Sequence, residues 1–267
     1  LSCLAHQAMA QNDVAPGVSG SFSLDRPFLA EDGSTVVEGQ LKGLEGATAI
    51  IKVKGKEMRF NLNQFAEKEQ KWIRQQIAIE KKRKSKWTEI NNLAVNLASN
   101  KRTVVTKACN RLKTFGPAAS HIAPQLDPHI KSSDARTRSA AFVCLVAISA
   151  DTPVAVQRIV GQFNNNPALA DTFSTNPSKV LTPFSRFGSR GLPYLGAVAF
   201  AGQLDVAAAD RSEIEARTDL DEQATKTRVA ACHAIARSEG DEEAANLLLE
   251  VLEAEVMSDR EGNQVGE

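Results

Sequence analysis

The chain has 267 residues, and Lys plus Arg equal Asp plus Glu at 32 each, so its net charge gives no reason to expect a nucleic acid or a membrane as partner. Only 5% of the residues are aromatic, which favours closely packed helices over a broad β-sandwich core. No stretch approaches the roughly 20 apolar residues of a membrane-spanning helix. The length allows one large domain, or a small domain followed by a larger one.

The charges are distributed unevenly along the chain. Residues 52–113 contain 17 Lys and Arg against 5 Asp and Glu, whereas residues 205–267 contain 6 Lys and Arg against 17 Asp and Glu. Such blocks are typical of solvated helix faces. The alternative is that the basic front and the acidic back favour weak self-association, or that the basic end binds an acidic partner.

The first residues have features of an export signal. Ala8-Met9-Ala10 before Gln11 has the small-x-small form that signal peptidase accepts. We therefore interpret residues 1–10 as the remnant of a signal peptide and residues 11–23 as a flexible N-terminus, and we expect export to the periplasm or the cell surface. A chance match in a cytoplasmic tail is the alternative.

The next segment has the features of a small β-sheet. Turn signals at Asp32-Gly33, Glu45-Gly46 and Lys54-Gly55 separate strand-like runs at residues 36–41, 48–53 and 57–62. These runs predict three or four strands in a small curled sheet. Residues 65–79 then change to helical spacing and supply an apolar stripe made of Phe65, Glu69, Trp72, Ile73, Ile77 and Ile79.

A family resemblance rests on this segment. Arg26-x-Phe28, Asp32-Gly33, "VVEGQLKGLEG" and "IIKVKGKEMRFNLNQFAEKEQKWI" follow one another as in the first homology domain of the Sla-type endocytic adaptors, which this segment resembles. Phe28 stands where that family usually has Trp. The resemblance implies an SH3-like small barrel at residues 24–78. In the adaptors this domain binds NPFxD peptides and contributes to cytoskeletal protein binding, and similar bacterial domains occur in exported proteins.

Recognition of an acidic peptide would require cations beside a groove. Lys52, Lys54, Lys56 and Arg59 are the candidate peptide-binding residues, because they alternate along the predicted hairpin. The alternative is an exposed hairpin that its lysines keep from aggregating.

A compact basic run, "IEKKRKSKW", occupies residues 79–87. We interpret it as a solvated linker helix. The alternative is binding of nucleic acid or another acidic polymer through Lys81–Lys86, but the Trp residues flank these cations instead of alternating with them, which makes nucleic acid the less favoured partner.

Residues 88–256 are predicted to be helical and repetitive, followed by a disordered acidic tail at residues 257–267. Three segments superimpose with a small central residue and a large aliphatic residue one turn later: Val105-x-x-Ala108-x-x-x-Leu112, Arg138-x-x-Ala141-x-x-x-Leu145 and Arg228-x-x-Ala231-x-x-x-Ile235. The pattern resembles HEAT-like repeats and implies an α-solenoid, with an ordinary helical bundle as the alternative. The fold class is therefore predicted as α+β multidomain.

Two local cues accompany the repeats. Phe115-Gly116-Pro117 and Phe187-Gly188 each follow a helix and open an apolar one. Asp134 precedes a repeat helix, so we expect it to cap that helix and to pair with an Arg of a neighbouring unit.

The sequence contains no recognisable catalytic motif. We find no phosphate-binding loop, nucleophile elbow, zinc helix or CxxC pair, so we predict no catalytic residues, no metal site and no cofactor. Cys232 and His233 point about 100° apart on a helix and do not form a thiolate and its base. Cys109, Cys144 and Cys232 are expected to be small packing residues that do not form a disulfide framework. The predicted function is a non-catalytic exported scaffold or adaptor, with an enzyme whose site in the helical domain is unrecognised as the alternative.

Overall fold

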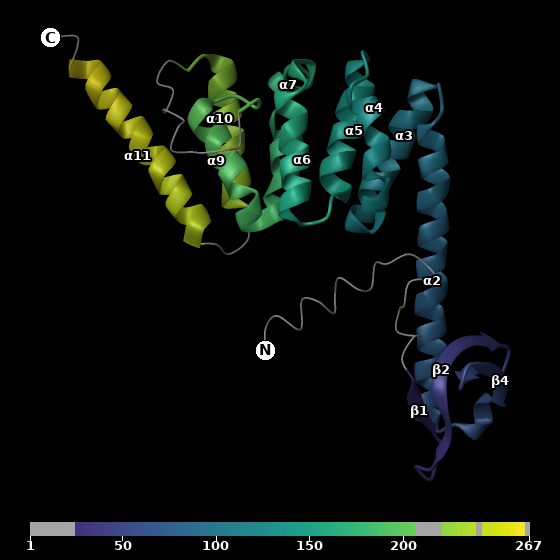
Figure 1. The fold of residues 1–267 in the computed structure, drawn as a ribbon. Coiled ribbons are helices and arrows are strands. Elements are labelled where there is room, and N and C mark those ends of the chain that lie inside the picture. The colour runs from purple at the N-terminus through teal and green to yellow at the C-terminus, as the bar shows by residue number, and fades with distance from the viewer. Residues whose placement is uncertain (1–24, 207–219, 239–241, 265–267) are drawn as a thin grey trace. The chain divides into compact units, whose positions relative to one another are not determined.

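The computed structural model describes residues 25–206, 220–238 and 242–264, and divides into two compact units with the boundary between Asn92 and Leu93 (Figure 1). The predicted signal-peptide remnant at residues 1–10 and the flexible segment at 11–23 lie outside the described residues. The described part has a small antiparallel sheet followed by helices, which agrees with the predicted α+β layout.

The first unit contains a four-stranded antiparallel sheet in chain order. Its strands are β1 (Arg26–Leu29), β2 (Thr35–Glu45), β3 (Thr48–Val53) and β4 (Lys56–Asn61), followed by the 3-10 turn η2 (Leu62–Gln64) and helix α2 (Glu67–Leu97). The three strand-like runs of the sequence are therefore confirmed. The sheet has one further short strand, β1, before them. Phe28, Leu41, Ile51, Phe65 and Ile73 form the buried core with 2% exposure or less.

Strand β2 requires a glycine where it passes close to β3. A Cβ at Gly39 would collide with the backbone carbonyl oxygen of Lys52, and it would also crowd the side chain of Ile51. Because a backbone atom cannot move away as a flexible side chain can, a larger residue at Gly39 would push the two strands apart.

Helix α2 includes the predicted linker helix. Residues 79–87 are helical, and the helix extends beyond them on both sides, from Glu67 to Leu97, and includes the unit boundary. The physical reason is that this stretch contains neither Pro nor Gly, so nothing in it stops a helix that has begun. Ile79, which we expected in the apolar stripe, is 49% exposed.

The second unit is helical in its described residues, and its helices stand side by side in chain order (Figure 1). They are α3 (Arg102–Leu112), η3 (Lys113–Leu126), α4 (Asp127–Ile130), α5 (Ala135–Ile148), α6 (Pro153–Asn164), α7 (Pro167–Ser174), α8 (Ser178–Phe184), η4 (Ser185–Arg190), α9 (Leu192–Ala201), α10 (Glu222–Ala236) and α11 (Glu242–Gln264). The structure has helix up to Gln264, where the sequence analysis expected a disordered tail from residue 257. That stretch has no Pro, and its first Gly is Gly262.

The residues that align in the three similar segments are buried. The central alanines of α3, α5 and α10 are at most 2% exposed, and the aliphatic residues one turn later are fully buried. These residues are Ala108, Ala141 and Ala231 in the first column and Leu112, Leu145 and Ile235 in the second. A small residue at the centre allows close helix packing, and the aliphatic residue fills the layer beside it.

The predicted cap of α5 is confirmed. The carboxylate of Asp134 accepts hydrogen bonds from the backbone N–H of Thr137 at 2.9 Å and from its hydroxyl at 2.6 Å. Arg102, at the start of α3, approaches the same carboxylate at 3.7 Å, so the cap also connects two helices. Asp221 caps α10 in the same way, through the N–H of Ala224 at 2.7 Å.

Arginine side chains connect helices that are 28 to 40 residues apart in sequence. Arg158 Nη2 donates to the carbonyl of Ala123 at 3.3 Å, and Arg186 Nη2 donates to that of Ser149 at 2.7 Å. Arg228 Nε donates to the carbonyl of Ala199 at 2.8 Å. Arg186 and Arg228 thus bond carbonyls at the C-terminal ends of α5 and α9, where helical donors are lacking. In the residues that the structure describes, no helix is both long and apolar enough to cross a membrane.

Candidate binding surfaces

The four cations of the candidate peptide site lie at the β3–β4 hairpin. Val53 pairs with Lys56, so the turn has two residues, Lys54 and Gly55, with φ of 47° and 87°. Positive φ at both positions is the geometry that matches the twist of a tight hairpin. Lys54 therefore lies at the tip in a backbone conformation that non-glycine residues seldom adopt.

The strand register divides these cations between two faces. Lys52 lies opposite Glu57, and Arg59 lies diagonally to Lys52 on the same face. Lys56 lies on the other face, opposite Val53. The structure thus brings Lys52 and Arg59 together and places Lys56 apart from them, with Lys54 at the end that both faces share.

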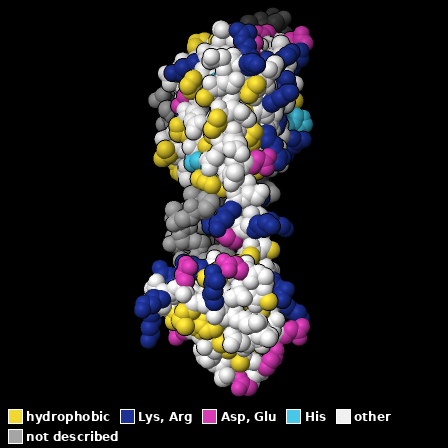
Figure 2. All heavy atoms as spheres, turned by 90° about the vertical axis from the view of Figure 1, so that its right-hand side faces the viewer, with side chains coloured by type: hydrophobic (Ala, Val, Ile, Leu, Met, Phe, Trp, Pro, Cys, Tyr) yellow, Lys and Arg dark blue, Asp and Glu magenta, His cyan; other side chains and the backbone are white. Residues whose placement is uncertain are grey.

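Neighbouring carboxylates reduce the local charge. Arg59 Nη2 lies 3.2 Å from Glu45 Oε2, with both side chains mostly exposed. On the face of the first unit in the lower part of Figure 2, Lys and Arg side chains are interspersed with Asp and Glu around a group of hydrophobic ones. Exposed ion pairs of this kind contribute little to stability. An acidic ligand can therefore replace Glu45 as the partner of Arg59 at little cost in free energy.

Strand β4 itself is exposed. It is an end strand of the sheet in the described part of the chain, and Lys56–Arg59 are all exposed. Met58, at 47% exposure, is a large apolar side chain on this strand. An end strand offers backbone donors and acceptors to an extended peptide, and an exposed apolar side chain next to cations adds contacts for its side chains.

Arg26, the first residue of the family-like motif, has a structural role. Its Nη2 donates to both carboxylate oxygens of Glu69 at 2.8 Å, and its guanidinium lies 4.0 Å from the centre of the Trp72 ring. Glu69 is 8% exposed, so this pair joins β1 to α2 in a partly buried environment. The sequence analysis placed Glu69 and Trp72 on the helical stripe but did not find their partner, because it lies 43 residues away.

The basic part of α2 does not form a single cationic stripe. Lys81, Lys82, Lys84 and Lys86 are exposed, but helical steps of 100° place Lys82 and Lys86 on a different side from Lys81 and Lys84. Arg83 instead forms hydrogen bonds with Glu80 at 2.8 and 3.0 Å.

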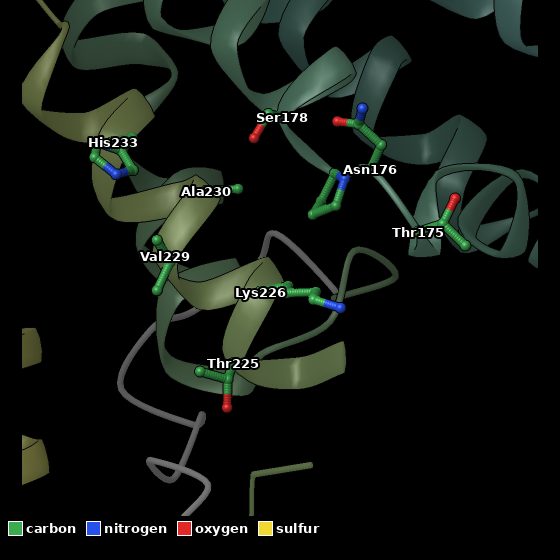
Figure 3. Close-up of a pocket in the computed structure, with 9 residues that line it drawn as sticks. Thr175, Asn176, Ser178, Thr225, Lys226, Val229, Ala230 and His233 are labelled. Atoms are coloured by element: carbon green, nitrogen blue, oxygen red, sulfur yellow. The ribbon is translucent and has the colours of Figure 1, made fainter. Parts of the chain in front are cut away.

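A groove of about 300 Å³ lies in the second unit between the α7–α8 turn and α10 (Figure 3). Asn176 comes from the turn, Ser178 begins α8, and Lys226, Val229 and His233 come from α10. Val229 is 50% exposed, and His233 is exposed at the rim of the groove. Cys232, next to it, is half-buried, which fits a packing position less closely than the fully buried Cys109 does.

Cys109 on α3 and Cys144 on α5 lie together, although the sequence separates them widely. Both thiols are buried and form a hydrogen bond with each other. This hydrogen bond lowers the pKa of Cys109 and raises that of Cys144, and burial raises the pKa of Cys144 further. The sequence analysis predicted their burial but not their contact.

His121 and His129 lie on either side of Asp127 in the sequence. Asp127 Oδ2 lies 2.7 Å from Arg158 Nη2, and burial lowers the pKa of His121. Among the described residues, no group of three or more His, Cys, Asp or Glu is placed to hold a metal ion.

Comparisons with protein-family models, curated proteins and solved structures gave no match to this chain. The resemblance to the Sla-type homology domain therefore stays a prediction. The same holds for the SH3-like barrel and the HEAT-like solenoid, which are finer descriptions than the small sheet and the row of helices that the structure has.

Proposed function

We propose that this chain is a non-catalytic, exported scaffold that binds protein partners through an SH3-like module at its N-terminal side and through a HEAT-like helical surface. Strand β4 is the observation that carries the proposal. It is a sheet edge with exposed Met58, it contains the cations Lys56 and Arg59, and it lies next to Lys54 of the turn and Lys52 of β3. An extended peptide with an acidic side chain would hydrogen-bond along β4 and place its carboxylate near the hairpin tip.

The contacts between the helices of the second unit support a binding role. Side chains connect helical segments that are not consecutive in the chain, such as Arg158 of α6 to Ala123 of η3 and Arg186 of η4 to Ser149 after α5. A row of helices held by nearest-neighbour contacts presents long exposed surfaces, and repeat proteins use such surfaces for partners. The groove beside α10 is one such place on the described part of this unit.

Fluorescence anisotropy tests the front module with the probe that the family resemblance implies, a labelled peptide containing Asn-Pro-Phe-x-Asp. The decisive variant of the full chain is Lys54→Asn, because Asn tolerates the positive φ of the tip and therefore removes the charge without straining the turn. We expect it to weaken binding about tenfold, since one charge-assisted contact contributes roughly 1.5 kcal/mol.

Two further variants identify the face that binds. Lys56→Gln changes one face of the hairpin, and Lys52→Gln with Arg59→Gln changes the other. Lys42→Gln is the matched control, because Lys42 is an exposed lysine of β2 away from the turn. Failure of the wild-type chain to bind the peptide more tightly than a scrambled version, or equal loss in Lys42→Gln, would remove this part of the proposal.

The exposed lysines of α2 favour a second candidate, binding of nucleic acid or another acidic polymer. A gel shift at low salt with a variant that converts Lys81, Lys82, Lys84 and Lys86 to Gln tests it. A salt-sensitive shift that disappears in the variant would support the second candidate. Export is tested separately, by following the protein in periplasmic and cytoplasmic fractions with an Ala8→Lys and Ala10→Lys variant.

A further inference from the structure

A second concave site in the helical unit has the character of an anion pocket. It is about 620 Å³ in volume and lies among the segment after α5, the η4 turn and the C-terminal end of α10. Arg186, Arg190 and Arg237 line it, against the single carboxylate of Asp151. Pockets of this size hold small molecules, and three guanidinium groups against one carboxylate leave a net charge of +2.

Arg186 is a fixed wall of the pocket. Its Nη1 donates to the carbonyl of Val146 at 2.5 Å, its Nη2 donates to that of Ser149 at 2.7 Å, and its guanidinium lies 4.6 Å from the centre of the Phe187 ring. Burial lowers its pKa, but from a value so high that the group remains charged at neutral pH. Because the Arg186 side chain is already fixed and partly desolvated, binding of an anion costs no further side-chain entropy at this residue.

The other two arginines are accessible. Arg190 Nη1 lies 2.7 Å from Asp151 Oδ2, and both side chains are nearly half exposed, so one edge of its guanidinium remains for a ligand. Arg237 is exposed at the end of α10, and the structure gives it no ion pair or hydrogen bond with the side chains it describes. Unlike Arg228 on the same helix, which is buried against backbone carbonyls, Arg237 has no evident role in packing.

We propose that this pocket binds a phosphate group, with Arg237 and Arg190 contacting its oxygens and Arg186 supplying the fixed charge behind them. A phosphate monoester carries about −1.5 to −2 at neutral pH, which matches the net charge of the lining, whereas a single carboxylate neutralises half of it. The hydroxyl of Ser189, exposed on η4, lies at the same wall and supplies a further donor. The site is independent of peptide binding by the first unit.

Isothermal titration of the full chain tests the proposal, with inorganic phosphate and phenyl phosphate as the two probes at constant ionic strength. We expect Arg237→Gln to weaken phosphate binding at least tenfold. Lys179→Gln is the matched control, because it removes an exposed cation of the helical unit that does not line the pocket, and it should leave the affinity unchanged. Tighter binding of the ester than of the inorganic ion would identify an organic phosphate as the ligand, and equal binding would identify free phosphate.

Three results would overturn the assignment. They are heats no larger than those of chloride, equal losses in Arg237→Gln and Lys179→Gln, or stronger binding of acetate than of phosphate. Lys54→Asn separates this site from the peptide site, because it should weaken the peptide and leave phosphate binding intact. Amide chemical shifts of Gly188–Arg190 that move on titration with phosphate would place the ion at the η4 turn.

Discussion

Replacement of Arg228 by Met should destabilise the helical unit strongly. Arg228 is 7% exposed, and its Nε and Nη2 donate to the carbonyls of Ala199 and Phe200 at 2.8 and 3.0 Å. Both carbonyls are in the last turn of α9, where no helical N–H remains to bond them. Met retains the length of the side chain but leaves these acceptors without the guanidinium.

The magnitude follows from two opposing terms. Two hydrogen bonds from an ionised donor contribute together roughly 3–6 kcal/mol. Part of that is offset because the variant no longer buries a charge, which leaves a net loss of about 3 kcal/mol. For a unit of this size, 1 kcal/mol corresponds to about 2–4 °C in Tm, so the transition of the helical unit should fall by about 6–12 °C.

Thermal unfolding followed by circular dichroism at 222 nm measures this shift. Lys226→Met is the control, since it removes a charge from the same helix at a side chain that is 56% exposed, and its Tm should stay within about 2 °C of wild type. If Arg228→Met unfolds at the wild-type temperature, the free-energy cost of burying the guanidinium equals the free energy that its hydrogen bonds contribute. The arginine contacts would then not hold the row of helices together.

Three further outcomes follow from the geometry. Gly39→Ala should destabilise the first unit by about 2 kcal/mol or more in urea unfolding, because the added Cβ meets a backbone oxygen of β3. In the native protein a thiol reagent should label Cys232 before Cys109 and Cys144, as peptide mass mapping would reveal, and fast labelling of the buried pair would contradict the packing. Hydrogen bonds from Thr137, with the side chain contributing most, lower the pKa of Asp134, so its contribution to stability is full above the unfolded pKa near 3.8 and is lost as the pH falls through the folded value. The Tm difference between wild type and Asp134→Asn should therefore be constant above about pH 5 and shrink below about pH 4.

Features that depend on local sequence could be predicted. The strands at residues 48–53 and 57–62 follow from turn glycines and β-branched residues, and the cap at Asp134 follows from its position before a helical pattern. The burial of Ala108 and Leu112 follows from spacing, because a helix places such residues on one face whatever lies opposite.

Contacts between distant segments could not be predicted. Glu69 shows nothing in its neighbourhood that identifies Arg26 as its partner, and the contact of Cys109 with Cys144 exists only because α3 packs on α5. The phosphate pocket has the same origin. Its arginines come from η4 and the end of α10, and no spacing in the sequence relates Arg190 to Arg237.

The glycines of the two Phe-Gly pairs in the sequence adopt similar backbone conformations. Gly116 has φ of 57° and ψ of −145°, and Gly188 has 49° and −136°, so both glycines adopt nearly the same conformation, which residues with a Cβ rarely adopt. Each lies directly after an aromatic residue with an arginine beside its ring, Arg111 at 5.0 Å from Phe115 and Arg186 at 4.6 Å from Phe187. The two turns therefore share one local backbone geometry. At the second of them the arginine also lines the pocket, so the same turn that ends one helical segment supplies the charged wall for a ligand.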